Sequence, residues 1–580
     1  MTDSHPTHKL GKKAKVLLSS VFGPYAVDDE YGSRAINPME LYQNQVTRVQ
    51  GIFSLRMFHQ SFGLALIQEN LEGPCTILDF PTLDQFINEV SENDYDVVGI
   101  TAIPPNILKA KKMCEVVREH LPQAKIIIGG HIANVPDIEK RLDADHVVKG
   151  DGVSWMRRYF GQDPEEPVKH PAVSSAFGSR IVGHSLSKNP KNTAAILVPS
   201  VGCPVGCNFC ATSALFGGKG KHINFYETGK ELFDVMCGIE KKLKVKSFFI
   251  LDENFLLQRK RALELLDLME AHGKHWALSV FSSARVLRSY EMEQLVRLGV
   301  SWVWMGMEDK ASQYRKLKGV DTHALVDELK ENGIRVLGST ILGLEHHTPE
   351  NIGQAIDHAV AHNTDFHQFM LYTPVPGTPL HAEHQAKGTL YPESEFSLSD
   401  AHGQYRFNYR HDHFKNGEEE QVIIDAFTRD FEVNGPSLSR IVRTYLRGWQ
   451  KYKNHSSRHV RRRMNWEIDP IRKDWAGAVW AMRKHYRHDP AMFEHMDRLL
   501  KDLYSEFGMQ TKILAPIIGR IVSLAMKREQ KRLDRGWAYE PQCLRRQNSA
   551  AKAQAQKSGA KFKRDLPLGA GSFKPVSGMG

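Results

Sequence analysis

The 580-residue chain has few cysteines and no long apolar stretch. Seven cysteines are an odd and modest number for this length, and three of them crowd into eight residues, a distribution that favours metal or redox chemistry over the disulfide framework typical of secreted proteins. No uninterrupted run of about 18 apolar residues occurs, so we expect no bilayer-spanning helix. Residues 1–15 are polar and lack the apolar core of a secretory signal. We therefore expect a cytoplasmic protein.

The composition is that of a folded protein with several domains. Hydrophobic residues make up 41% and charged residues 25% of the chain, which is ordinary for a globular protein and excludes a disordered or fibrous one. A net charge of +10 favours acidic partners, such as nucleic acid, anionic lipid or a phosphorylated substrate. Composition alone does not choose among them.

Residues 1–160 predict a Rossmann-like, doubly wound α/β domain. Short apolar runs at 16–18, 76–78, 97–100, 126–128 and 146–148 alternate with helical stretches, a pattern typical of a parallel sheet. The carboxyl ends of such strands are where these folds bind ligands. Glycine-containing turns follow two of these strands, at 129–131 and 150–152, and neither is a GxGxxG fingerprint. The strand-end residues are Thr101, Gly129, Gly130, His131, Gly150, Asp151 and Gly152.

A proline-containing linker at 161–190 leads to a second α/β domain at 191–390. Six expected strands, at 195–198, 247–251, 277–281, 302–307, 335–342 and 367–372, are interleaved with amphipathic helices. This order predicts a partial (β/α)6 barrel with its site at the carboxyl ends of the strands. Residues 400–540 predict a basic helical region, and residues 545–580 are expected to be disordered.

Three of the seven cysteines lie within eight residues, directly after the first barrel strand. Cys203, Cys207 and Cys210 stand on a loop with two glycines, and thiolate is the ligand that iron-sulfur clusters require. A structural zinc site needs four ligands, and His222 is a candidate for the fourth. A cluster with one open iron fits the triplet better.

The cysteine spacing, with Phe209 before the last cysteine, resembles the radical S-adenosylmethionine (SAM) superfamily over roughly residues 192–380. The resemblance implies that the three cysteines hold a 4Fe-4S cluster whose open iron binds SAM. One electron then cleaves SAM, and the 5'-deoxyadenosyl radical abstracts hydrogen from an unactivated carbon. The resemblance also implies an external reductant such as flavodoxin or ferredoxin.

Further segments match this superfamily. Residues 251–255 stand where many members bind the SAM amino group, in an acidic form similar to the cobalamin-associated branch. Residues 338–345 resemble the stretch beside adenine, and residues 372–380 resemble the Pro-x-Pro-Gly-Thr ending. The SAM-binding residues that the resemblance implies are Phe209, Asp252, Glu253, Asn254, Arg285 (carboxylate), Glu308 (ribose) and Gly343.

Given that barrel, the amino-terminal domain resembles the cobalamin-binding domain of the same branch. Its turns at 129–131 and 150–152, with Thr101, would then contact cobalamin. The chain has no Asp-x-His-x-x-Gly motif, so the lower face of the cobalt would lack that histidine ligand. The alternative is a domain that only packs against the barrel.

The resemblance predicts cobalamin-dependent C-methylation of a lipid, isoprenoid or secondary metabolite. Radical SAM cyclisation, oxidation or carbon–carbon coupling without methyl transfer is the alternative within the family. From another class, a basic nucleic-acid-binding protein with a structural metal site is favoured by the arginines at 458–463 but lacks a known module. The interrupted apolar segment at 513–526, next to an arginine-bearing helix, suits peripheral contact with the inner face of an anionic membrane.

Overall fold

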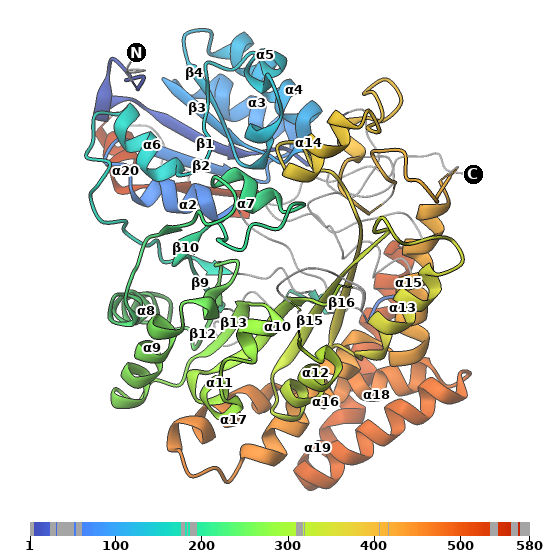
Figure 1. The fold of residues 1–580 in the computed structure, drawn as a ribbon. Helices are drawn as coiled ribbons and strands as arrows, with labels where there is room; N and C mark the ends of the chain where they lie inside the picture. Colours follow the sequence, from blue (N-terminus) through green and yellow to red (C-terminus); the bar gives the residue numbers. More distant parts are fainter. Residues whose placement is uncertain are drawn as a thin grey trace.

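The computed structural model describes residues 5–23, 31, 51–53, 61–175, 180–181, 184–185, 194–308, 317, 319–404, 406–415, 417–533, 543–557 and 567–568. Within these ranges the molecule consists of two parallel-sheet α/β units and a set of carboxyl-terminal helices (Figure 1). The predicted α/β fold class is confirmed.

The amino-terminal unit is a parallel sheet with a crossover order. Its strands follow the order β2-β1-β3-β4-β5 and run parallel throughout, which is the flavodoxin-like form of a doubly wound sheet. Helices between the strands cover it (Figure 1). The elements are β1 (Val16–Ser20), α2 (Phe62–Glu69), β2 (Cys75–Asp79), α3 (Leu83–Glu92), β3 (Val97–Thr101), α4 (Ile107–His120), β4 (Lys125–Gly129), α5 (Ile138–Leu142), β5 (His146–Val147) and α6 (Gly152–Tyr159).

The prediction that residues 545–580 are disordered is wrong for part of this segment. Strand β17 (Cys543–Gln547) extends the amino-terminal sheet antiparallel to β2, and helix α20 (Ser549–Lys557) follows it. Arg545 forms a buried ion pair with Glu89 on α3, at 2.9 Å. Burial of this pair explains why a basic segment is ordered here. Of the rest of the predicted tail, 558–566 and 569–580 lie outside the described residues.

The second unit contains all six expected strands. They run parallel in chain order, from β9 to β16. Strand β6 (Ser174–Ser175), from the predicted linker, pairs antiparallel with β9 at one edge, so the sheet is open. The parallel strands are β9 (Ala194–Leu197), β12 (Ser247–Ile250), β13 (Ala277–Phe281), β14 (Val300–Gly306), β15 (Arg335–Leu342) and β16 (Phe366–Leu371).

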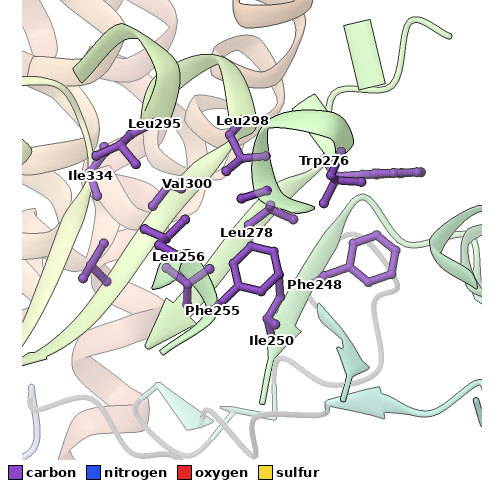
Figure 2. Close-up of a cluster of buried hydrophobic side chains, with 14 of the residues drawn as sticks. Phe248, Ile250, Phe255, Leu256, Trp276, Leu278, Leu295, Leu298, Val300 and Ile334 are labelled. Atoms are coloured by element: carbon purple, nitrogen blue, oxygen red, sulfur yellow. The ribbon is translucent and has the colours of Figure 1, made fainter. Parts of the chain in front are cut away.

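Outer helices and these strands enclose a large apolar core. Phe248, Leu278 and Val300, from three neighbouring strands, point toward side chains from the covering helices (Figure 2). All three are fully buried, and this core fixes where the strands end. The helices are α8 (Gly229–Leu243), α9 (Arg259–Ala271), α10 (Ala284–Leu287), α11 (Met292–Leu298), α12 (Thr322–Glu331), α13 (Ile352–Ala361) and α14 (Pro379–Ala386).

Buried arginines hold the carboxyl-terminal helices to one another and to the second unit. Arg440, which its sequence position places on an outer face, instead points inward and binds Asp430 at 2.7 Å. Arg463 is also buried and donates to the Val300 carbonyl. These arginines are part of the scaffold. The helices are α15 (Glu418–Asn434), α16 (Ser437–Tyr452), α17 (Arg458–Pro470), α18 (Ala476–His485) and α19 (Pro490–Leu533).

Helix α19 corrects the expectation that no segment is long enough to span a bilayer. Among the described residues, residues 490–528 form one helix that by length and composition alone meets that requirement, with 17% of its apolar window buried. The backbone is non-helical at Gly508, so the apolar half begins at Met509. The isolated apolar runs in the sequence were short because Pro516 and Arg520 interrupt them, yet the helix continues through both.

Candidate active site

The cysteine loop is a compact turn between a short strand and a short helix. It follows β10 (Ser200–Val201) and leads into α7 (Ala211–Leu215), whose first turn donates a backbone N–H to the Cys210 sulfur at 3.5 Å. Gly206 has a φ of +67°, and an added Cβ would lie 2.5 Å from the Cα of Lys219. Only glycine therefore lets the loop close on itself here.

The three sulfurs are partly buried and influence one another. Burial raises the pKa of the Cys203 thiol to about 11, and Cys210, Cys207 and Glu253 add to the shift. A bound cation would reverse this, because metals bind the thiolate. The loop thus has the donor set for a metal centre.

A separate group of potential metal ligands lies outside the cysteine loop. Ligand atoms of His323, His358 and His362, on and beside α12 and α13, lie within 4.8 Å of one another. His222, the candidate zinc ligand, is exposed.

Two neighbouring acids after β12 have different surroundings. Asp252 is buried, accepts from the Ser200 hydroxyl at 2.6 Å and pairs with Arg261 at 2.7 Å. Glu253 has a buried Oε2 without a hydrogen-bond partner. Burial and the charge of Asp252 raise the pKa of Glu253 to about 7. Glu253 is thus the acid available to a ligand, whereas Asp252 already has its partners.

Asn254 continues this polar strip toward the next strand end. Its side chain contacts the Ser282 and Ser283 hydroxyls, at 3.4 and 3.5 Å. These serines follow β13, so the carboxyl ends of β12 and β13 meet as expected. Arg285, one turn further on, is exposed, and no contact places it beside Glu253.

Glu308 and Gly343 lie together at the ends of β14 and β15. The carboxylate of Glu308 is buried and accepts from the Ile341 N–H at 3.2 Å. Gly343 donates its N–H to His347 Nδ1 at 3.0 Å, and the Phe407 ring leaves no room for a side chain. Both residues are therefore held firmly at the strand ends.

The Pro-Gly-Thr segment after β16 packs onto the cysteine loop. Leu380 donates its N–H to the Asn208 carbonyl at 3.0 Å, and Tyr372 accepts from the Asn208 amide. Phe209 lies against Tyr372, with ring centroids 6.3 Å apart. The Asn208 Oδ1 is buried without a partner. Phe209 thus joins the two segments that the sequence assigned separately.

The amino-terminal unit touches the helix that follows the cysteines. His131 contacts the Thr212 hydroxyl on α7 at 3.2 Å, and burial lowers the pKa of His131. A Cβ on Gly150 would lie 4.0 Å from the carbonyl oxygen of Leu215, also on α7. The two predicted turns therefore lie against the helix that begins at Cys210.

The other residues predicted in these turns have different environments. Gly130, with a φ of +82°, packs on Thr101, and an added Cβ would approach the Thr101 hydroxyl to 2.7 Å. An added Cβ on Gly129 would meet nothing within 4 Å. Asp151 caps α6 through the Val153 and Ser154 N–H groups, and Gly152 packs on Ile67. Gly129 therefore leaves the most room for a ligand.

Sequence reasoning missed several polar residues of this region. Ser200 and Arg261 fix Asp252, and Thr212 contacts His131. Ser200 directly precedes the cysteine segment, so its position was a usable signal. Arg261 lies on α9 among ordinary helix residues, and no sequence signal pointed to its role.

The cobalamin-binding domain predicted from the sequence is confirmed by comparison with known proteins. Residues 52–159 match the model of the B12 binding domain family. The chain is 26% identical over 330 residues to bacteriochlorophyllide d C-12(1)-methyltransferase of Chlorobaculum tepidum, covering 53% of this chain and 70% of that protein. It is 22% identical over 435 residues to hopanoid C-2 methylase of Rhodopseudomonas palustris, and the match covers 70% of this chain and 80% of that protein.

Among solved structures, the radical SAM methyltransferase TsrM of Kitasatospora setae, with cobalamin and a [4Fe-4S] cluster, is similar at 14% identity. The match has a TM-score of 0.49 and covers 78% of this chain and 98% of that one. The family match and the relatives agree with the resemblance found in the motifs.

Proposed function

We propose that this chain is a cobalamin-dependent radical SAM enzyme that methylates an unactivated carbon of a small molecule. The observation that carries the proposal is the contact between His131 and Thr212. It joins the glycine turn of the B12-binding domain to the helix that begins at Cys210. A methyl donor and a radical source need to act on one substrate, and this contact brings their two binding segments together.

The residues fit the groups that this chemistry needs. Cys203, Cys207 and Cys210 would hold the iron-sulfur cluster, and the unpaired oxygen of Glu253 would accept from the SAM ammonium. The open space at Gly129 and the absence of a cobalt-ligating motif fit cobalamin held by backbone contact. When bound, these groups supply an electron, a hydrogen-abstracting radical and a methyl group.

The chain's own residues position the ligands and keep their surroundings dry. Arg261 and Ser200 hold Asp252, whereas the following residue, Glu253, keeps a buried oxygen without a hydrogen-bond partner. Phe209 and Tyr372 pack an apolar wall beside the last cysteine. Exclusion of water protects a radical from side reactions.

The substrate class that we propose is a lipid or isoprenoid. The match to hopanoid C-2 methylase extends over 70% of this chain, which includes far more than the cofactor-binding domain. We further propose a cytoplasmic enzyme that receives its electron from flavodoxin or ferredoxin, because reductive cleavage requires an external one-electron donor.

Anaerobic reconstitution of the full chain tests the proposal. We expect bound iron, sulfide and cobalt, formation of 5'-deoxyadenosine on reduction with SAM, and a methylated product from an anaerobic lipid extract when the SAM methyl group is isotopically labelled. Deoxyadenosine without cobalt or label transfer would point instead to cyclisation, oxidation or coupling. Absence of both iron and deoxyadenosine would refute radical SAM chemistry.

Cys237→Ala is the matched control for Cys203→Ala, Cys207→Ala and Cys210→Ala. Cys237 is a partly buried thiol on α8, away from the loop. We expect each loop variant to lose the cluster and deoxyadenosine formation, while the control retains both. Equal iron content in all four variants would show that the loop does not hold the cluster.

A further inference from the structure

Helix α19 presents an apolar stripe to solvent. Met509, Ile513, Ile517, Ile521 and Leu524 follow one another at intervals of three or four residues and are each between 50% and 69% exposed. This spacing places them along one side of a helix. Large aliphatic side chains rarely form a continuous exposed stripe on a monomeric soluble protein. An exposed apolar stripe of this kind is typical of a site that binds a membrane or another protein.

The opposite side of the same helix is firmly packed. Thr511 and Ala515 are buried, and the Thr511 hydroxyl donates to the Arg472 carbonyl at 2.9 Å. Gly519 lies directly against the Trp480 ring, and an added Cβ on Gly477 of α18 would lie 2.5 Å from Ile518. Because one side is fixed to the protein, the helix is suited to lie along a surface and unsuited to cross a bilayer.

The charges around the stripe indicate what kind of surface it binds. Residues 509–528 contain four basic residues, Lys512, Arg520, Lys527 and Arg528, and no acidic residue. All four are exposed. A second copy of this face would bring like charges together, which disfavours self-association. An anionic bilayer accepts both features, since the apolar side chains enter the acyl region and the long basic side chains reach the headgroups.

We propose that α19 docks the protein on an anionic lipid bilayer, with the stripe from Met509 to Leu524 facing the membrane. In Figure 1, α19 lies at the bottom of the view, well apart from α7, which is near the middle. Docking is therefore separable from the chemistry of the candidate active site. The inference goes beyond the proposed function, and either can fail without the other.

Co-sedimentation of the full-length protein with vesicles tests the docking. Vesicles of equal parts phosphatidylglycerol and phosphatidylcholine are compared with vesicles of phosphatidylcholine alone. We expect binding to the anionic vesicles that weakens with salt. The variant I513Q/I517Q/I521Q should bind at least about tenfold more weakly, and K527Q/R528Q should lose about fivefold for each charge removed.

The matched control is L257Q/V433Q, which replaces two exposed aliphatic side chains outside the stripe. All substituted positions are exposed, so circular dichroism and Tm should stay unchanged. Wild-type binding by the stripe variant, or equal loss in the control, would overturn the proposal. A stripe-dependent dimer in sedimentation velocity without vesicle binding would also overturn it, in favour of a second copy.

Discussion

Arg261 binds the buried carboxylate of Asp252 at 2.7 Å, while the next residue, Glu253, keeps a buried oxygen without a partner. The sequence places both acids at one strand end and assigns them the same role. The structure separates them: Asp252 is part of the scaffold, and Glu253 is the acid available to a cationic ligand. The ion pair determines which of the two is available.

We therefore predict that Glu253→Gln weakens SAM binding by about tenfold or more, because an ammonium loses a charged acceptor and keeps only a neutral one. Cluster content should remain at the wild-type level. Equilibrium binding of SAM to the anaerobically reconstituted protein measures the effect. Glu227→Gln, at an exposed acid before α8, is the control, and equal affinity for the two variants would contradict the assignment.

Arg261→Met should destabilise the fold rather than act on SAM directly. It leaves a buried carboxylate unpaired, a change that typically costs about 3–5 kcal/mol. Urea unfolding of the protein measures the loss. The double variant R261M/D252N should recover part of it, because the uncompensated charge is removed. Lys260→Met, at the exposed neighbouring position, should change stability by less than about 0.5 kcal/mol.

Replacing a glycine with alanine should be harmful on the cysteine loop, where it lowers iron content, and beneficial inside a helix, where it raises stability. Gly206→Ala brings a Cβ against the Lys219 backbone at a positive φ, so we expect the loop to open and iron content to fall to less than half. Gly238→Ala, inside α8 with free space around it, should raise stability by about 0.5–1 kcal/mol. Iron content and Tm of the two variants distinguish these effects. Normal iron content in Gly206→Ala would show that the loop tolerates the side chain.

The adjacent glycines after β4 separate a structural from a binding role. Gly130→Ala places a Cβ 2.6 Å from the Ala102 carbonyl oxygen, so we expect a lower Tm. Gly129→Ala meets nothing within 4 Å, so its Tm should match wild type while its cobalamin content falls. Cobalamin is measured by absorbance after reconstitution. Full cobalamin content in Gly129→Ala would move the cofactor away from this turn.

The strands were predictable because local patterns determine them. The expected strands at 277–281 and 335–342 coincide with β13 and β15 residue for residue. Each is a short apolar run bounded by turn residues, and its burial on both faces of a parallel sheet requires that pattern. The cysteine loop was predictable for the same reason, since its ligands are neighbours in sequence.

Pairings between side chains of different elements were not predictable. Helical spacing alone places Arg440 on an outer face, but its partner Asp430, ten residues earlier, lies on another helix and draws it inward. Arg545 lies in a segment read as disordered, yet it pairs with Glu89 across 456 residues. In both cases the charge appears exposed until its partner on another element is known. The difference between Asp252 and Glu253 was hidden in the same way.

Protonation of His367 should destabilise the protein in acid. The ring is buried between the Thr340 and Thr364 hydroxyls, at 2.9 and 3.2 Å, and stacks on Phe369. Burial lowers the pKa of His367 from 6.5 to about 4. Below pH 6.5 the unfolded chain therefore binds a proton that the folded protein does not, so stability falls as the pH drops from about 6.5 to 4.

The shift corresponds to a loss of about 2 kcal/mol between pH 7.5 and pH 5. Urea unfolding at these two pH values, in wild type and in His367→Gln, isolates the contribution. Glutamine can still bond to a threonine hydroxyl but does not titrate, so the variant should lose about 2 kcal/mol less than wild type over this interval. His120→Gln, at an exposed histidine at the end of α4, is the control and should keep the wild-type slope. An identical slope in His367→Gln would mean that this ring is protonated in the folded protein without penalty.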